Sequence, residues 1–324
     1  MILNGSLPNS CEAATPSGRV ACIVITYNPD MDLLRASLDA LKDESCSVTV
    51  VDNGSANIAE LRHEIDRHDV TLVALGSNEG IASAQNHGIR LQADADFVFL
   101  LDQDTVTPPG IIAALLDDAY HLQKEGLRLA AIGLPYRDYY TGRPAAAFRT
   151  MDGQIRRLDL SGDTGRFAET DFVIASGSFI PMTTLKDVGM MEEDLFIDLV
   201  DLEWCLRAAS AGYRCVLSLS HAISHRIGDR RARLFGRSIT MHAPIRNYYF
   251  TRNCLLLAQR SYIPMCWKRY FLSRASFSLV AFVLVGDARL TRLRFMLHAL
   301  HDGMKRWGGP YGKTVKVRHE KALP

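Results

Sequence analysis

Short apolar runs alternate with amphipathic stretches along the first part of the chain. The apolar runs are too short for helices and are typical of strands buried on both faces of a sheet. They cover residues 20–25, 48–51, 70–74 and 97–101. Between them, apolar residues recur at helical spacing within residues 33–41, 58–66 and 81–91. This order predicts an α/β fold with a mostly parallel sheet flanked by helices and right-handed crossovers.

The pattern is less regular after residue 104. We expect a helix from Ile111 and a strand over residues 130–134, whereas the polar segment 136–170 is typical of loops or a hairpin. A further strand is predicted over Phe172–Ala175, leading into a turn of small residues at 176–178.

Polar loops follow all four of the first predicted strands. They read Thr26-Tyr27-Asn28, Asp52-Asn53-Gly54, Asn78-Glu79-Gly80 and Asp102-Gln103-Asp104. Taken one at a time, such residues are common in turns. The carboxyl ends of parallel strands meet at one edge of a sheet, however, and ligands bind there. No Gly-x-Gly-x-x-Gly follows the first strand and no Walker-type motif occurs, which disfavours ordinary dinucleotide and P-loop sites.

The pair Asp102 and Asp104 has a chemical and a structural interpretation. Residues two apart in an extended chain point the same way, so both carboxylates can approach one hard cation that takes its other ligands from a diphosphate. Alternatively, the acids belong to a turn that caps the helix beginning after Pro108-Pro109-Gly110. The pattern at this point leaves both open.

Charge divides the chain into two parts. The formal net charge of the 324 residues is only +1, but residues 225–324 hold 20 Lys and Arg against 4 Asp and Glu. Residues 254–304 mix apolar and basic side chains in a way that predicts amphipathic helices, which suit an anionic membrane surface. Helices packed on the rest of the protein, or buried in a homo-oligomer, would explain the same apolar residues.

Composition excludes several classes of protein. The seven cysteines include no Cys-x-x-Cys pair, which favours a reducing compartment and disfavours a zinc site or a disulfide framework. No apolar run reaches the roughly 20 residues of a membrane-spanning helix. Residues 1–19 are mostly polar, without a signal-peptide pattern, and are expected to form a flexible leader.

The motifs together resemble the family 2 glycosyltransferases of the GT-A, Rossmann-like fold. The resemblance is carried by the following segments in family order: Val24–Asn28, Val51–Ser55, Asn78–Gly80 with Asn86–Gly88, and Leu101–Asp104. The later segments Asp198–Arg207 and His225–Asp229 narrow it to the rhamnosyltransferase branch. The resemblance implies a catalytic domain over residues 20–240 and a basic, amphipathic helical extension over residues 241–324.

The resemblance also implies roles for individual residues. The nucleotide-sugar would be bound by Thr26, Tyr27, Asn28, Asp52, Asn53, Gly54, Asn78, Gly80, Asp102 and Gln103. A carboxylate such as that of Asp52 accepts hydrogen bonds, which suits recognition of a pyrimidine N–H. Asp102, Asp104 and His225 would ligate Mn²⁺ or Mg²⁺, which stabilises the departing diphosphate. Gly177, Ser178, Glu203, Trp204 and Arg252 would lie against the donor or acceptor sugar.

The resemblance assigns the catalytic base to Asp201, six residues before Arg207. Val200 replaces the acid that many relatives carry at that position, so Glu203 stays an alternative. The N-terminus of a helix favours acids in any case, which is the structural explanation for both.

The implied reaction is inverting transfer of L-rhamnose from dTDP-L-rhamnose to a lipid-linked saccharide acceptor in O-antigen or exopolysaccharide synthesis. It would occur in the cytoplasm, at the inner face of the plasma membrane. A single displacement needs only one base, and no enzyme nucleophile. The alternatives are a GT-A transferase that uses a UDP-sugar and a non-catalytic module that binds a nucleotide or an anionic polymer. We expect no nucleic-acid partner, because the three acids Asp102, Asp104 and Asp201 would repel phosphates in the absence of a metal.

Overall fold

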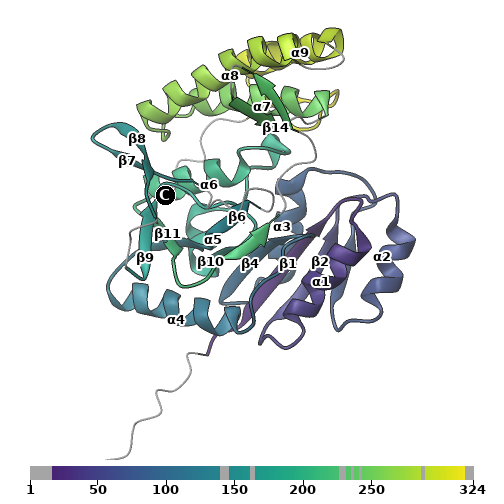
Figure 1. Ribbon diagram of the computed structural model, residues 1–324, viewed down its shortest axis with the longest axis vertical. Coiled ribbons are helices and arrows are strands. Elements are labelled where there is room, and N and C mark those ends of the chain that lie inside the picture. The colour runs from purple at the N-terminus through teal and green to yellow at the C-terminus, as the bar shows by residue number, and fades with distance from the viewer. Residues whose placement is uncertain are drawn as a thin grey trace, which may run out of the picture.

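A mixed sheet of eight strands forms the centre of the molecule (Figure 1). The computed structural model describes residues 17–138, 146–160, 165–225, 231–234, 237–240, 243–285 and 289–317. The strand order is β3-β2-β1-β4-β10-β5-β11-β9. Six strands are parallel: β1 (Val20–Thr26), β2 (Ser47–Asp52), β3 (Thr71–Ala74), β4 (Phe97–Asp102), β5 (Leu129–Gly133) and β11 (Arg214–Ser218). The two antiparallel strands are β10 (Ser178–Pro181) and β9 (Phe167–Thr170).

Helices cover both faces of the sheet. Along β1, Ile23 and Ile25 join the core on one face while Cys22 and Val24 join the core on the other, as alternation along a strand requires. The first face is covered by α3 (Ile81–Leu91), α5 (Met182–Val188) and α6 (Val200–Ser210). The second is covered by α1 (Met31–Leu41), α2 (Ile58–Ile65) and α4 (Ile111–Lys124). Burial on both faces explains why the strands are apolar without alternation.

Three further helices form a layer at one end of the molecule, above α6 in Figure 1. They are α7 (Pro244–Ala258), α8 (Met265–Val285) and α9 (Arg289–Lys305), and the expectation of a C-terminal helical extension is confirmed. Pro244 occupies the first turn of α7, where its missing N–H has no helical partner to lose. Leu257 of α7 and Trp267 of α8 belong to the same buried cluster as α6 and one face of the sheet. The extension therefore continues the core of the α/β unit.

The segment between β5 and β10 contains the expected hairpin, formed by β7 (Ala147–Met151) and β8 (Gln154–Leu158). The prediction of a strand over Phe172–Ala175 is wrong. β9 ends at Thr170 and β10 begins at Ser178, so these residues lie in the connection between two strands. Their apolar side chains are buried by packing instead, with Val173 in the core of the α6 face.

Small elements complete the described chain. They are β6 (Tyr136–Asp138) with β12 (Ile223–His225), β13 (Arg231–Leu234) with β14 (Arg237–Thr240), β15 (Trp307–Gly308) with β16 (Val315–Lys316), and the 3₁₀ helix η1 (Glu193–Leu195). Within the described ranges, no helix is both long and apolar enough to cross a membrane. Residues 1–16 of the expected leader lie outside the described residues.

Candidate active site

The four polar loops meet at one edge of the sheet and are hydrogen bonded to one another. The backbone N–H of Tyr27 donates to Oε1 of Gln103 at 2.8 Å, which joins the first loop to the fourth. The backbone N–H of Asn28 donates to Oγ of Ser55 at 2.8 Å, which joins the first loop to the second. Asn53 accepts from the backbone N–H of Glu79 at 2.8 Å, which joins the second to the third. The structure therefore brings together the loops that the sequence singled out separately.

Asp52 lies at the centre of the second loop and is only 1% exposed. Its carboxylate accepts hydrogen bonds from Oγ1 of Thr26 (3.2 Å), from the backbone N–H groups of Gly54 (3.2 Å) and Ser55 (3.0 Å), and from Oγ of Ser55. Gly54 has a φ of +80°, and a Cβ there would lie 2.4 Å from the carbonyl carbon of Ser77. Only glycine fits this crossing of two loops.

Asp102 ends β4, and the residues after β9 fold beneath it. Its backbone N–H donates to Oγ of Ser176 at 3.0 Å, and that hydroxyl also lies 2.7 Å from Oγ1 of Thr105. Gly177 follows with a φ of +86°, and the buried Ser178 hydrogen bonds to the carbonyl of Ala175 at 2.8 Å. Gly177 and Ser178 thus lie next to the Asp-x-Asp motif, as expected for residues near a donor sugar. Contact with a sugar stays a prediction.

Asp201 lies in the first turn of α6, on the other side of the same connection. Its Oδ2 accepts from the backbone N–H of Ala175 at 3.3 Å, and its Oδ1 accepts from the N–H of Leu202 at 2.8 Å. The carboxyl also lines a small, mostly apolar cavity with Leu100, Trp204 and other residues of the sheet and α6. Burial raises the pKa of Asp201 above its usual range, and nearby Asp198 adds to this, although the backbone hydrogen bonds oppose it. A partly buried carboxylate with a raised pKa is a suitable proton acceptor.

Two consecutive residues connect the two groups of acids. Ala175 contacts Asp201 and Ser176 contacts Asp102, so the predicted base and the predicted metal motif flank one short loop. The start of that loop is fixed by Asp171, which accepts from Nε1 of Trp267 in α8 at 2.8 Å.

Arg246 of α7 brings a positive charge to this area. It pairs with both oxygens of Asp198, with Nη2 2.9 Å from Oδ1 and Nε 3.2 Å from Oδ2. Burial alone would lower the pKa of Arg246, but the charges of Asp198 and Asp102 raise it above its usual range. Arg246 is therefore a cation beside the edge that carries the Asp-x-Asp motif.

Glu203, Trp204 and Arg252 are completely or almost completely buried. Glu203 accepts from Nε of Arg207 at 2.8 Å and from the hydroxyl of Tyr262 at 2.6 Å. Nε1 of Trp204 donates to the carbonyl of Gly189 at 2.8 Å. Because partners within the protein occupy these groups, we assign them a supporting role under the site. Their burial also leaves Asp201 as the better candidate for the base.

The metal assignment rests on Asp102 and Asp104. Among the described residues, no group of three or more His, Cys, Asp or Glu side chains is placed to hold a metal ion. The side chain of His225, the third predicted ligand, lies outside the described residues. Two carboxylates at a strand end suit Mg²⁺ or Mn²⁺, which commonly takes few protein ligands and completes its shell with phosphate oxygens and water.

Some residues that support the site carry no signal in the sequence. Phe196 contacts Gly80 of the third polar loop, and Tyr262 contacts Glu203. Ser55 belongs to the segment Val51–Ser55 that carries the resemblance, but its hydrogen bond to Asp52 was not predicted. Only the (i, i+4) spacing of Glu203 and Arg207 could have indicated an ion pair within α6.

Comparison with known proteins agrees with this arrangement. The model of the family "Glycosyl transferase family 2" matches residues 21–170, which include all four polar loops. The chain is also 30% identical to the dTDP-rhamnosyl transferase RfbF of Shigella flexneri, over 89% of this chain and 96% of that protein. The chain belongs to glycosyl transferase family 2. It is a glycosyltransferase, similar to rhamnosyltransferases.

Solved structures of two other proteins show the same fold. A structure of S. aureus TarS (residues 1–349) with UDP-GlcNAc has a TM-score of 0.56 and 15% identity, over 89% of this chain and 81% of that one. A structure of GalNAc-T7 with UDP, GalNAc and Mn²⁺ has a TM-score of 0.57 and 13% identity. It covers 88% of this chain, which spans only 57% of GalNAc-T7. The GT-A architecture predicted from the motifs is therefore confirmed.

Proposed function

We propose that this family 2 glycosyltransferase transfers L-rhamnose from dTDP-L-rhamnose, with inversion, to a saccharide acceptor in cell-surface polysaccharide synthesis. The observation that carries the proposal is the placement of Asp102 and Asp201 on the two sides of the loop containing Ala175 and Ser176. The similarity to RfbF over nearly its whole length supports the choice of donor. The acceptor would be a growing O-antigen or exopolysaccharide chain on a lipid carrier.

The donor would bind across the four joined loops. Thr26, Tyr27 and Asn28 would border the base, the buried Asp52 would hold the second loop in place around it through its four internal hydrogen bonds, and the diphosphate would lie near Asp102. Asp102 and Asp104 would hold a divalent metal ion, which would neutralise the charge that develops on the leaving diphosphate. The partly exposed Arg246 would add positive charge to the same area.

Asp201 would remove the proton from the acceptor hydroxyl as that oxygen attacks the anomeric carbon. Attack from the side opposite the diphosphate inverts the configuration in one displacement, so no covalent enzyme intermediate is needed. Glu203 is a poor alternative, because Arg207 and Tyr262 already occupy its carboxylate in the interior.

Calorimetric titration with dTDP and with UDP tests the donor assignment. Each nucleotide should be titrated with Mn²⁺, with Mg²⁺ and with chelator. We expect metal-dependent binding that prefers dTDP and that weakens at least about tenfold in Asp104→Ala, because the metal bridges protein and diphosphate. A preference for UDP would replace dTDP-L-rhamnose by a UDP-sugar. Absence of nucleotide binding under all conditions would support a non-catalytic module instead.

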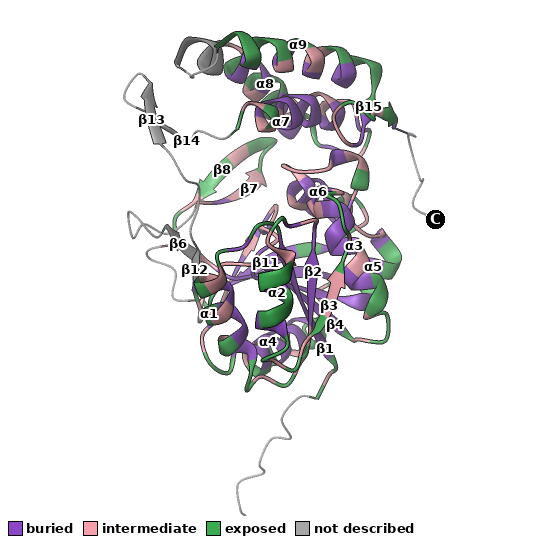
Figure 2. Cartoon of the chain, turned by 90° about the vertical axis from the view of Figure 1, so that its right-hand side faces the viewer, coloured by how far each residue is buried: buried purple, intermediate pink, exposed green. Residues whose placement is uncertain are grey.

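We also propose that the outer surface of α8 and α9 contacts an anionic membrane. Leu290, Leu297 and Met304 of α9 are 83%, 55% and 67% exposed and recur on one helical face. Arg289, Arg294 and Lys305 beside them are exposed as well, and Figure 2 shows α9 at the edge of the molecule. Within the described residues 243–285 and 289–317, the single acidic residue is the buried Asp302. Apolar and basic side chains without exposed acids favour an anionic lipid surface.

Sedimentation with vesicles tests the membrane proposal. The wild-type protein should pellet with vesicles that contain phosphatidylglycerol and not with vesicles of phosphatidylcholine alone. Leu297→Asp should reduce the pelleted fraction, whereas Leu91→Asp, at an exposed leucine of α3, should not. If Leu297→Asp instead changed the sedimentation coefficient of the free protein, the surface would be an interface between copies of the chain.

A further inference from the structure

The segment that leads into α6 has an unusual backbone. Phe196, Asp198 and Leu199 have φ values of 64°, 67° and 65°, although none of them is glycine. Left-handed conformations are unfavourable for residues with a Cβ, and they persist when the surrounding structure fixes them. The first helical hydrogen bond of α6 follows at once, from the N–H of Glu203 to the carbonyl of Leu199 at 2.9 Å. The conformation of this segment therefore sets where the helix begins and where Asp201 points.

One side chain from α7 holds this segment. The amide Nδ2 of the completely buried Asn253 lies within hydrogen-bonding distance of the carbonyls of Leu195 (3.0 Å), Ile197 (2.8 Å) and Asp198 (2.9 Å), which share its two N–H groups. Its Oδ1 accepts from Nε and Nη2 of the neighbouring Arg252, at 3.1 and 3.0 Å. A guanidinium can only donate, so it fixes the amide with Nδ2 toward the three carbonyls.

The segment 195–199 is also held by the third polar loop and the start of α3. The carbonyl of Phe196 accepts from the backbone N–H of Ile81, the first residue of α3, at 2.8 Å. Gly80, which precedes it, has a φ of +89°, and a Cβ there would lie 2.5 Å from the Phe196 carbonyl oxygen. The segment 195–199 is thus held between the third donor loop and α7.

We propose that Asn253 is a positioning residue for the catalytic base: it imposes the left-handed turn that aims Asp201 at the loop beside Asp102. This inference rests on the proposed role of Asp201 as the base. Asn253 does not reach the substrate. It acts through three backbone carbonyls, so its removal should change the chemical step more than it changes donor binding.

Three variants test the inference. Asn253→Ala removes the donors, and Tyr248→Phe is the matched control: Tyr248 is equally buried in α7, its hydroxyl donates to Asp302 at 2.6 Å, and phenylalanine keeps the ring that lies beside Arg252. Asp201→Asn reports on the base itself. For each variant we would measure kcat, the dissociation constant for dTDP with metal, and the pH profile of kcat.

We expect Asn253→Ala to lower kcat about 10- to 100-fold, as misplacement of a catalytic group does, with dTDP affinity changed less than about twofold. The acid limb of its pH profile should move to lower pH, because a displaced Asp201 is better hydrated. Tyr248→Phe should leave kcat within about twofold of wild type and should not move the acid limb of the pH profile. Adding Leu199→Gly to Asn253→Ala should restore part of kcat, since glycine adopts the left-handed turn without strain.

Equal losses of kcat in Asn253→Ala and Tyr248→Phe, with an unmoved acid limb, would make Asn253 a merely structural residue. Should Asn253→Ala fail to fold, Asn253→Ser would replace it, because serine keeps one hydrogen-bond donor. Its kcat, its dTDP affinity and its pH profile would be compared with those of Tyr248→Phe in the same way. If Asp201→Asn kept nearly the turnover of wild type, Asp201 would not be the base. An inactive Asp201→Asn beside an unimpaired Asn253→Ala would overturn only the present inference.

Discussion

The four polar loops proposed to bind the donor (the donor loops) and the segment that leads to the proposed base, Asp201, are held in different ways. The donor loops at the ends of β1 to β4 hydrogen bond chiefly to one another and lie within residues 26–105. The segment 195–199 is held by side chains of α7 that follow it by 55 to 58 residues. The donor half is therefore largely self-sufficient, whereas the base depends on the C-terminal helices.

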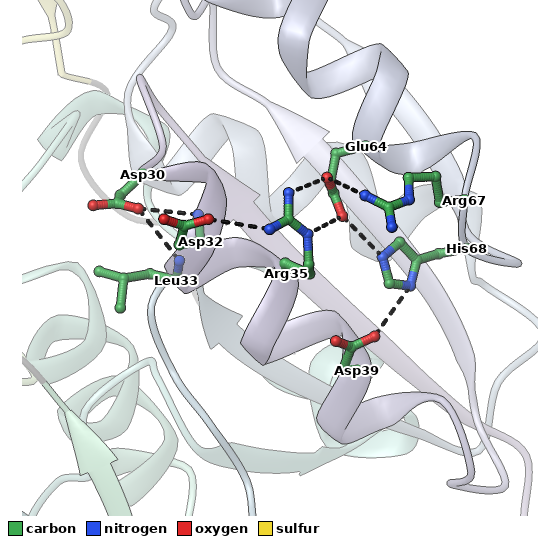
Figure 3. A network of polar contacts seen from close by, with 8 residues as sticks. All are labelled: Asp30, Asp32, Leu33, Arg35, Asp39, Glu64, Arg67 and His68. Atoms are coloured by element: carbon green, nitrogen blue, oxygen red, sulfur yellow. Dashed lines mark hydrogen bonds and ion pairs between the residues drawn. The ribbon is translucent and has the colours of Figure 1, made fainter.

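Ion-pair networks also differ between the two halves: one in the donor half lies within it, whereas one in the base half involves the C-terminal part of the chain. In the donor half, Glu64 of α2 accepts from Arg35 of α1 at 2.7 and 2.9 Å, and Arg67 and His68 also contact its carboxylate (Figure 3). This network joins two neighbouring helices. In the base half, the buried pair of Glu203 and Arg207 is completed by Tyr262, from the connection between α7 and α8. The comparison predicts that changes in the base half affect the rate or the stability without weakening donor binding, and that changes in the donor half affect binding or stability.

The largest expected effect is on turnover by Asp201→Asn. Loss of the general base should lower kcat about 10²- to 10⁴-fold, while dTDP still binds with metal. Steady-state kinetics and calorimetry on the same preparation would check this. Nearly unchanged turnover with intact donor binding would contradict the assignment.

The same variant should gain stability relative to wild type as the pH rises. The pKa of Asp201 is raised in the folded state, so its contribution to stability is full below the unfolded pKa and is lost as pH rises through the folded pKa. Asparagine has no charge to bury, although its NH₂ group cannot accept one of the two backbone hydrogen bonds. We therefore expect the difference in Tm between Asp201→Asn and wild type to move in favour of the variant as the pH of thermal unfolding rises, and a difference that does not change with pH would argue against the raised pKa.

Arg207→Met should cause the largest loss of stability. It leaves the completely buried Glu203 without its cation, and removing one partner of a buried pair typically costs about 3–5 kcal/mol. Arg90→Met is the matched control, because its pair with Glu193 is roughly half exposed and should contribute less than about 1 kcal/mol. Urea unfolding of both variants would measure the difference, and equal losses would contradict the assignment of Glu203 as a buried anchor.

Gly54→Ala should weaken the donor half specifically. Gly76→Ala is its control, because both glycines have positive φ but only at Gly54 would the new Cβ meet another loop. The conformational strain common to both is about 1–2 kcal/mol. The additional clash at Gly54 should lower dTDP affinity about tenfold by displacing Asn78. Equal dTDP affinities in the two variants would indicate that the contact between the loops is not needed for binding.

A modest loss of stability at pH 7, without a change in kcat, is expected from Arg35→Met, because the Arg35 side chain of the pair is partly exposed to solvent. The hydrogen bond from Arg35 is the main reason that the pKa of Glu64 falls to about 2 from 4.5. This contribution is full above about pH 4.5 and is lost as pH falls toward 2. Unfolding curves of wild type and variant should therefore converge in acid. If the free energies of unfolding of wild type and Arg35→Met differed by the same amount from pH 7 to pH 3, the pair of Arg35 and Glu64 would not be the source of that difference.

The sequence predicts the donor half well because its signals are local. Four apolar runs, each followed by a polar loop, were enough to predict β1 to β4 and the loops that meet beside them. The resemblance singled out Asp201 through its spacing to Arg207, and Asp201 lies in the first turn of α6. Direct contact of these residues with a substrate stays a prediction.

Prediction is weaker where partners are distant in the sequence. Phe172–Ala175 has the composition of a strand, but its backbone groups hydrogen bond to the side chains of Thr170, Asp201 and Cys205 instead of to a neighbouring strand. Glu203 and Arg252 look like functional charges in the sequence. Their burial depends on Tyr262 and on the carbonyls of Asp194, Leu195 and Gly309, and no local pattern indicates those contacts.

The hydrogen bond from Asn253 to the carbonyl of Asp198 can form only late in the synthesis of the chain. Asn253 is added 55 residues after Asp198, which at about 5–20 residues per second corresponds to about 3–11 s of translation. During that interval the nascent chain already contains every donor loop, but not the side chain that holds the turn before α6. If the proposed roles of Asp201 and Asn253 hold, the donor loops can therefore form before the base is in position, and activity would appear only when α7 has been made.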